Sequence, residues 1–356
     1  MPAGPRDPGR GAVDEQPGAC GDVGVGAARA DAGVAVTARP EYNRFSGGKM
    51  MLQHAGVTMI EREGRRVTAR RWPIHGWLGL GIVAIFWTLN WSLPGLRTHW
   101  AFFPLWLGYC LTVDALVYQR KGDSMLTRSP RAYAGLFLVS MPAWWLFELL
   151  NGRTQNWVYE GRQFFSDAQY AVLASLSFST VMPAVFGTAE LVSTFDWLAR
   201  ARRGLRIVPT QATLLGFFGA GWLMLALLYL WPHAFFPFLW LSVYFILEPL
   251  NVWLGNRTLA THTAAGDWRP VYALWVGCLI CSFFWEMWNF YSYPKWVYRV
   301  PVADALHVFE MPLLGYGGYL PFSLELFAIY HLIVGLVDRE GREAFVRVAP
   351  GRVEKA

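Results

Sequence analysis

Several carboxylic acids lie inside apolar stretches of this 356-residue chain. A charged side chain at the centre of a bilayer costs at least about 2.5–3.5 kcal/mol. No Lys or Arg lies deep in these stretches to pair with the acids. An acid that stays protonated there is a proton donor, whereas an acid that hydrogen-bonds a neighbouring helix stabilises the bundle. The seven acids are Asp114, Glu148, Glu190, Glu248, Glu286, Glu310 and Glu325.

Two of these acids belong to polar patches that occur twice along the chain. Asn151 follows Glu148 by three residues, and Asn289 follows Glu286 by three. Residues three apart share one face of a helix, so each acid and its Asn form a single patch. A helix rises about 1.5 Å per residue, which puts both patches near the outer membrane face. We expect the two patches to face each other.

Aromatic residues crowd the same outer layer. One interpretation is the belt of Trp and Tyr that membrane proteins place at the lipid–water interface. The other is a cavity, because aromatic faces stabilise cations and a nearby acid creates a carbocation by protonation. The two interpretations are compatible for each residue. The expected ligand-binding residues are Asn151, Asn289, Trp145, Trp157, Tyr159, Trp285, Trp288, Trp296 and Tyr298.

The composition indicates that membrane-spanning helices carry these side chains. Hydrophobic residues make up 54% of the chain and charged residues 16%, whereas soluble domains carry about 25% charged residues. This excludes a soluble enzyme, a disordered protein and a nucleic-acid binder. We predict an all-α, polytopic membrane helical bundle with eight transmembrane helices, each long enough to cross about 30 Å of hydrocarbon. The stretches are about 75–93, 101–119, 132–151, 170–197, 212–231, 235–254, 270–291 and 311–337.

Basic residues alternate between the loops that connect these stretches. One set of loops and termini carries 20 Lys and Arg residues, and the opposite set carries 5. By the positive-inside rule, this bias predicts that both termini are cytoplasmic. The formal net charge of +6 therefore sets orientation and does not indicate a nucleic-acid surface. We expect a multi-pass protein of the cytoplasmic membrane, surrounded by the lipid bilayer.

An internal duplication organises the chain. Four motifs recur in the same order, at an offset of about 129–139 residues: 102–106 with 235–240, 145–151 with 283–289, 157–159 with 296–298, and 182–183 with 311–312. Four helices per copy make the two halves parallel, related by an axis along the membrane normal. The predicted division is a disordered, basic cytoplasmic segment at 1–71, four-helix repeats at 72–205 and 206–338, and a cytoplasmic tail at 339–356.

Pro and Gly interrupt the last apolar stretch. Residues 309–321 contain two Pro and three Gly, and a continuous helix through them is costly. The segment either lines a cavity or forms a loop before a shorter final helix.

No pattern in the sequence indicates a cofactor. Cys278 and Cys281 have the spacing of a metal or redox pair, but no second pair or His cluster accompanies them. Motifs for phosphate-binding loops and dinucleotides do not occur either. We expect no metal and no other cofactor.

The acid motifs resemble the lycopene cyclase domain of heterodimeric-type carotenoid cyclases, in tandem duplicate. That family has a Trp-Asp/Glu helix, a Trp-x-Phe/Tyr segment and a Leu-Pro-x-Glu-Glu start to the final helix. The second half of this chain has Trp285-Glu286, Trp296-Val297-Tyr298 and Leu320-Pro321 followed by Glu325, and the first half has a weaker copy with Glu148. A single Glu325 stands where the family has two adjacent Glu residues. The resemblance implies proton-initiated, redox-neutral cyclisation of an isoprenoid within the membrane, without metal or nucleotide.

Three functions follow from these observations. As an isoprenoid cyclase, the protein would use Glu286 or Glu325 as the proton donor, with Glu148 as the symmetric partner and Glu310 as a further candidate. As a proton-coupled carrier, it would use the same acids as titrating sites. As a non-catalytic membrane assembly subunit, it would use them to tie helices together. The expected ligand is a membrane lipid or an isoprenoid, and the oligomeric state stays open.

Overall fold

A computed structural model describes residues 71–201, 204–300, 306–337 and 345–349. The predicted N-terminal segment at 1–71, apart from its last residue, and most of the tail at 339–356 lie outside the described residues.

Seven helical segments of the described residues are long and apolar enough to cross a membrane. An eighth is bent by 40° at a short break and passes the same test as a pair of pieces. The predicted multi-pass helical membrane protein is therefore confirmed, with seven spans, or eight if the bent pair counts as one. The segments are α1 (Ile74–Ser92), η1–α2 (Gly95–Thr98 and Phe102–Lys121), α4 (Pro130–Thr154), α5–α6 (Asp167–Phe178 and Val181–Val192), α8 (Gln211–Leu230), the bent α9–η3–α10 (Pro232–Phe235, Phe236–Trp240 and Ser242–Leu254), α12 (Arg269–Phe290) and η4–α13 (Leu313–Gly318 and Tyr319–Val337).

Short elements join these spans, and some of them are strands. The helical connectors are α3 (Met125–Arg128), η2 (Arg162–Phe164), α7 (Asp196–Arg200) and α11 (Ala260–Ala264). The strands form two antiparallel two-stranded sheets, β1 (Trp157–Glu160) with β2 (Lys295–Tyr298), and β3 (His307–Val308) with β4 (Met311–Pro312). The described residues are mostly helical, as predicted, and these short strand pairs lie at one end of the helical bundle.

Local sequence signals set the ends of the two helices that flank β1. Ser129 caps α4, since its side chain accepts a hydrogen bond from the Ala132 amide. Gln155 then ends α4 in a left-handed conformation, with φ of 54°, and the chain turns into β1. Ser166 and Gln169 form a reciprocal capping box that starts α5. The segment between Gln155 and Ser166 contains β1, so the two caps fix the ends of the segment that carries this strand.

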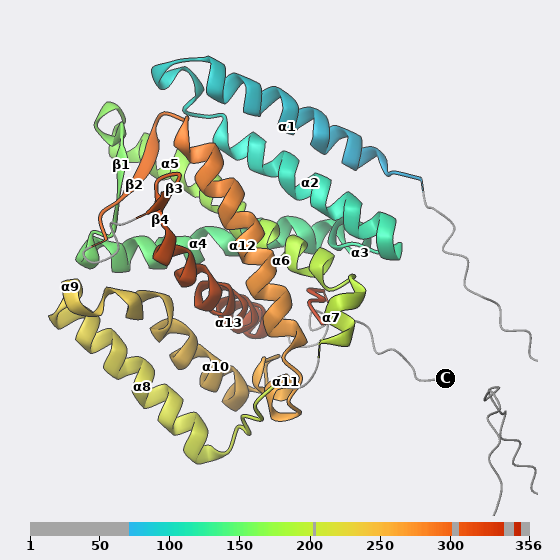
Figure 1. Cartoon of the computed structure of the whole chain (residues 1–356), viewed down its shortest axis with the longest axis vertical. Helices are drawn as coiled ribbons and strands as arrows, with labels where there is room; N and C mark the ends of the chain where they lie inside the picture. The colour runs from blue at the N-terminus through green and yellow to red at the C-terminus, as the bar shows by residue number, and fades with distance from the viewer. Residues whose placement is uncertain (1–70, 202–203, 301–305, 338–344, 350–356) are drawn as a thin grey trace, which may run out of the picture. The chain divides into compact units, whose positions relative to one another are not determined.

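The spanning helices pack against one another in pairs (Figure 1). Helix α1 packs on α2, and α8 packs on α10. Helix α12 contacts both α6 and α13, while α4 contacts α6. A Cβ atom at Gly277 of α12 would lie 2.6 Å from the Ala189 amide nitrogen of α6. Glycine at this position therefore permits the close approach of α12 to α6, as small residues do in membrane bundles.

Two acids, one on α2 and one on α10, make the same kind of contact. Asp114 of α2 accepts from the Leu126 amide at 3.0 Å, and Glu248 of α10 accepts from the Ala260 amide at 2.7 Å. In both cases the donor lies twelve residues after the acid, at the start of a short helix. Both acids thus anchor a connector at the end of the bundle opposite β1 and β2.

Basic side chains reach Glu190 and Glu310 from helix ends and loops. Arg128 donates two hydrogen bonds to Glu190, at 2.9 and 2.8 Å, and Lys121 pairs with the same carboxylate. Lys295 pairs with Glu310. No Lys or Arg lies deep in the apolar stretches, but Glu190 and Glu310 pair with basic residues that lie outside those stretches. The expectation that the acids lack basic partners is therefore wrong for these two.

Candidate functional site

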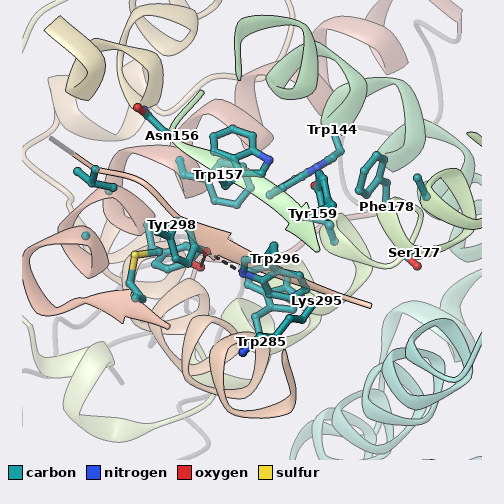
Figure 2. Close-up of a pocket in the computed structure, with 18 of the residues that line it drawn as sticks. Trp144, Asn156, Trp157, Tyr159, Ser177, Phe178, Trp285, Lys295, Trp296 and Tyr298 are labelled. Atoms are coloured by element: carbon teal, nitrogen blue, oxygen red, sulfur yellow. Dashed lines mark hydrogen bonds between the residues drawn. The ribbon is translucent and has the colours of Figure 1, made fainter. Parts of the chain in front are cut away.

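A cavity of about 800 Å³ lies at the end of the bundle that carries β1 and β2. Residues of α4, β1 and α5 line it from one half of the chain, and residues of η3, α12, β2, η4 and α13 line it from the other. Figure 2 shows aromatic side chains from both halves gathered around it. The large aromatic residues of the lining are Phe102, Trp144, Trp157, Tyr159, Phe165, Tyr170, Phe178, Phe236, Phe238, Trp240, Trp285, Tyr293, Trp296, Tyr298, Tyr319 and Phe322.

The β1–β2 pair forms one aromatic wall of the cavity. Trp157 lies opposite Tyr298, and Tyr159 lies opposite Trp296. Alternate residues of a strand share one face, so these four rings stand on the same side of the sheet. All four line the cavity.

Asn151 and Asn289 hold the two strands in place from behind. Asn151 donates to the Trp157 carbonyl at 2.9 Å, and Asn289 donates to the Trp296 carbonyl at 2.7 Å. Asn289 also accepts from the Trp296 amide at 2.9 Å. Both Asn side chains are buried and neither belongs to the cavity lining. The structure therefore places these two predicted ligand-binding residues behind the wall, where they position the strands.

Glu286 lies fully buried behind two tyrosines of the lining. Its Oε1 accepts hydrogen bonds from the Tyr298 hydroxyl at 2.7 Å and the Tyr319 hydroxyl at 2.6 Å. Its Oε2 has no hydrogen-bond partner among the described residues, and no ion pair to Glu286 occurs within them. Glu286 is not itself a lining residue, whereas both tyrosines are. The two tyrosine hydroxyls therefore connect this acid to the cavity lining.

Burial keeps the strand tyrosines protonated. Desolvation, followed by the nearby Glu286 carboxylate, raises the pKa of Tyr298 well above its usual range. Desolvation and Glu148 do the same to the pKa of Tyr159. Each hydroxyl therefore stays a hydrogen-bond donor at neutral pH.

Glu148 has a different set of partners from Glu286. Its Oε1 accepts from Trp144 Nε1 at 2.9 Å, Trp157 Nε1 at 3.0 Å and the Tyr159 hydroxyl at 2.5 Å. Three donors thus converge on one oxygen of Glu148, whereas Glu286 accepts from two hydroxyls and keeps one oxygen without a partner among the described residues.

Three predicted ligand-binding residues remain, and each has a different environment. Trp285 lines the cavity and stacks on Tyr319, with ring centroids 6.1 Å apart. Trp288 lies in the core, 5.1 Å from the ring of Trp106. Trp145 donates to Ser175 at 3.0 Å, where α4 packs on α5. Neither Trp288 nor Trp145 is a lining residue.

None of the four predicted catalytic acids is itself a lining residue, and Glu325 and Glu310 lie apart from the tyrosines that contact Glu286. Glu325 lies deeper in α13, fully buried, where it accepts from the Val243 amide at 3.2 Å. Glu310 forms its ion pair with Lys295 at the edge of the site. Neither is a lining residue, and Tyr319, not Glu325, is the α13 residue that touches Glu286.

Sequence reasoning did not single out Tyr319, Trp240 or Phe322 as site residues. Tyr319 begins α13 directly after the Gly-rich η4, and residues of η4 line the cavity as well. Of the two alternatives for the interrupted stretch, the segment both lines the cavity and precedes a shorter final helix. The signal that points to Tyr319 is thus its place at the end of that interruption.

No group of three or more His, Cys, Asp or Glu side chains within the described residues is arranged to hold a metal ion. Comparison with known protein families, curated proteins and solved structures gives no match for this chain.

Proposed function

We propose that this protein is a membrane-embedded enzyme that binds an isoprenoid chain in the aromatic cavity and cyclises it by acid catalysis. The observation that carries the proposal is Glu286, a buried acid that hydrogen-bonds two cavity-lining hydroxyls, those of Tyr298 and Tyr319. The resemblance to lycopene cyclase domains suggests the same class of reaction. A buried, unpaired acid beside a ligand-sized apolar cavity is typical of a functional site.

The proposed reaction needs no redox partner. A tyrosine hydroxyl gives its proton to one carbon of a C=C bond, while Glu286 passes a proton to that hydroxyl. The carbocation so formed is attacked by a second C=C bond of the same chain, which closes a ring through a new C–C bond. A neighbouring C–H then loses its proton, and the proton returns through the hydroxyl to the Glu286 carboxylate. The product is an isomer of the substrate, so electrons and protons balance.

Aromatic faces and one fixed charge suit the intermediate. Trp157, Trp285 and Trp296 line the cavity, and a ring face stabilises a desolvated cation by up to about 2 kcal/mol. Glu148 lies behind the same aromatic wall, where Trp144, Trp157 and Tyr159 donate hydrogen bonds to it. In this proposal Glu148 stabilises the cation electrostatically, and Glu286 alone donates the proton.

Matching contacts support an origin by duplication. The pairs Asn151 with Trp157 and Asn289 with Trp296 repeat one hydrogen bond, and Glu148 with Tyr159 repeats Glu286 with Tyr298. We propose two parallel four-helix repeats whose two acids have diverged in role. From the charge bias of the loops we also propose a location in the cytoplasmic membrane, with both termini in the cytoplasm and the cavity toward the outer face.

Expression in lycopene-accumulating cells tests the proposal. If the substrate is a carotenoid, wild type should convert lycopene to a cyclised product. Glu286→Gln should then lower turnover by about 10²–10⁴-fold, the usual contribution of a general acid. Glu248→Gln is the matched control, because it removes another fully buried acid of the second half that lies outside the cavity. Extracted carotenoids report the outcome, and membrane fractions report insertion.

The same variants separate the other functions when ligand binding and proton coupling are measured as well. If wild type inserts normally and only lycopene accumulates, the carotenoid form of the proposal is wrong. A proton-coupled carrier would show ligand binding that survives Glu286→Gln while proton coupling is lost. A non-catalytic assembly subunit would show neither effect.

A further inference from the structure

We propose that the isoprenoid bound in this cavity carries a phosphate head group, which lies at the end of the cavity formed by α1, η1 and the start of β2. This inference rests on the proposed function, because it names the class of ligand for the same cavity. It also separates two classes of ligand, since a pure hydrocarbon has no head group to place there.

Two buried donors at this end lack partners. Asn90, near the end of α1, and Thr98, in η1, line the cavity and are each only 3% exposed. Asn90 Nδ2 and Thr98 Oγ1 have no hydrogen-bond partner among the described residues. A buried polar group without a partner carries a desolvation penalty, so such groups are almost always paired in native proteins. A bound group that accepts hydrogen bonds would satisfy both.

Basic side chains lie in the same lining. His99, Arg162 and Lys295 line the cavity, and no Asp or Glu is found among its lining residues within the described part of the chain. Arg162 pairs with Asp167, whose side chain is 99% exposed, and Lys295 pairs with Glu310. Solvent-exposed ion pairs are weak, so a phosphate that enters the cavity competes well for Arg162. Arginine and lysine are the usual phosphate ligands.

Ring and backbone contacts bring these side chains to one end. The His99 ring lies 5.4 Å from the Phe165 ring, and Arg162 donates to the Phe165 carbonyl at 2.8 Å. On the other side, the Phe102 ring lies 5.6 Å from Trp296, the neighbour of Lys295 in β2. The η1 segment is therefore connected to η2 and to the start of β2.

The acid lies at the opposite end of the same strand. Tyr298 follows Lys295 by three residues, which corresponds to about 10 Å along β2. A head group held near Lys295 would send its isoprenoid chain past Trp296 toward the Tyr298 hydroxyl and Glu286. The proton would thus reach a double bond remote from the phosphate.

Binding of three compounds that share one chain tests this inference. Wild-type protein in nanodiscs should bind geranylgeranyl phosphate at least about 10-fold more tightly than geranylgeraniol or the corresponding C20 hydrocarbon, as expected for one charge-assisted hydrogen bond gained. Inorganic phosphate at millimolar concentration should not displace the ligand, because the chain supplies most of the buried surface. Displacement by inorganic phosphate would assign the site to a free anion and overturn the inference.

Variants at the two ends of the cavity supply the matched comparison. Asn90→Leu and Thr98→Val should each weaken binding of geranylgeranyl phosphate by about 10-fold and leave geranylgeraniol unchanged, whereas Thr98→Ser should restore the difference. Asn156→Leu is the control, since Asn156 is an equally buried lining residue with an unpartnered Nδ2 at the far end of the aromatic wall. A loss of selectivity in Asn156→Leu alone would overturn the assignment of the head-group end.

Two outcomes keep the failure of this inference apart from the failure of the proposed function. Equal binding of all three compounds by wild type, whether or not the variants fold, would overturn the head-group inference and leave the isoprenoid cavity standing. Binding of none of the three would overturn both.

Discussion

Trp157 of β1 pairs with Tyr298 of β2, although the two residues occupy opposite ends of the same Trp-Val-Tyr motif. The two copies of the motif therefore run antiparallel and form one continuous wall, with the central valines, Val158 and Val297, directly opposite each other. Each copy brings its tyrosine to one carboxyl, Tyr159 to Glu148 and Tyr298 to Glu286. The pairing thus makes one cavity from two halves of the chain.

The asparagine behind β2 should be needed for this wall. Asn289→Ala removes the hydrogen bonds to the Trp296 carbonyl and amide and leaves both backbone groups without their side-chain partner. We expect a loss of about 1–3 kcal/mol in unfolding free energy, because buried polar groups are left unpaired. Thermal unfolding in detergent measures it. Asn256→Ala, a change in a partly buried Asn near α11, is the control and should cost less.

The two tyrosines should act together as the route from Glu286. Tyr298→Phe or Tyr319→Phe should each lower turnover, and the double variant should fall to the level of Glu286→Gln, because no hydroxyl then joins the acid to the cavity. Product formation by the purified variants measures this. Full activity in the double variant would show that the proton takes another path.

The pH dependence of turnover should show no decline from ionisation of Tyr298. Burial raises the pKa of Tyr298 well above 10.0, so the hydroxyl keeps its proton as the pH rises toward 10. Turnover should therefore not fall between pH 8 and 10 through ionisation of this group, as long as the protein stays folded. A profile measured in nanodiscs, with unfolding followed in parallel, tests this. A decline with a midpoint below pH 10 that disappears in Tyr298→Phe would contradict the account.

At the other end of the bundle, the ion pair between Arg128 and Glu190 should contribute more to the free energy of unfolding than the exposed pair between Arg162 and Asp167. Arg128→Ala leaves the buried Glu190 with Lys121 alone and should cost about 3–5 kcal/mol, as expected when one partner of a buried pair is removed. Arg162→Ala breaks a pair with an exposed Asp167 and should cost at most about 1 kcal/mol. Unfolding midpoints of the two variants compare them directly.

The orientation of the chain is a separate prediction. A fluorescent reporter at the C-terminus should be bright and a phosphatase reporter there inactive, because the basic loops favour the cytoplasm. The opposite pattern would place the aromatic cavity toward the cytoplasm.

Sequence patterns predicted the spans well, because the length and polarity of an apolar stretch depend only on neighbouring residues. The boundaries of α1 and α8 agree with those expected to within two residues. The sequence also singled out the rings of Trp157, Tyr159, Trp296 and Tyr298, since a duplicated motif next to an acid is visible in it. All four line the cavity, and their role in ligand binding stays a prediction.

Contacts between residues far apart in the chain could not be predicted from the sequence. Strand β1 has four residues and pairs with a segment nearly 140 positions away. A segment this short has neither the length nor the periodicity that would predict a strand. The partners of Glu190 come from helix ends, one of them 62 positions away, and no local pattern links them. Tyr319 reaches Glu286 from another helix, 33 positions along the chain.

Deuterium incorporation tests the central claim most directly. Purified protein in nanodiscs is given the isoprenoid that it converts, in buffer made with D2O, and the product is analysed by mass spectrometry. Proton-initiated, redox-neutral cyclisation predicts a cyclic product with the elemental composition of the substrate and one deuterium in place of hydrogen, and none of it from Glu286→Gln. A cyclic product without deuterium, or one that has gained or lost two hydrogens, would contradict the account.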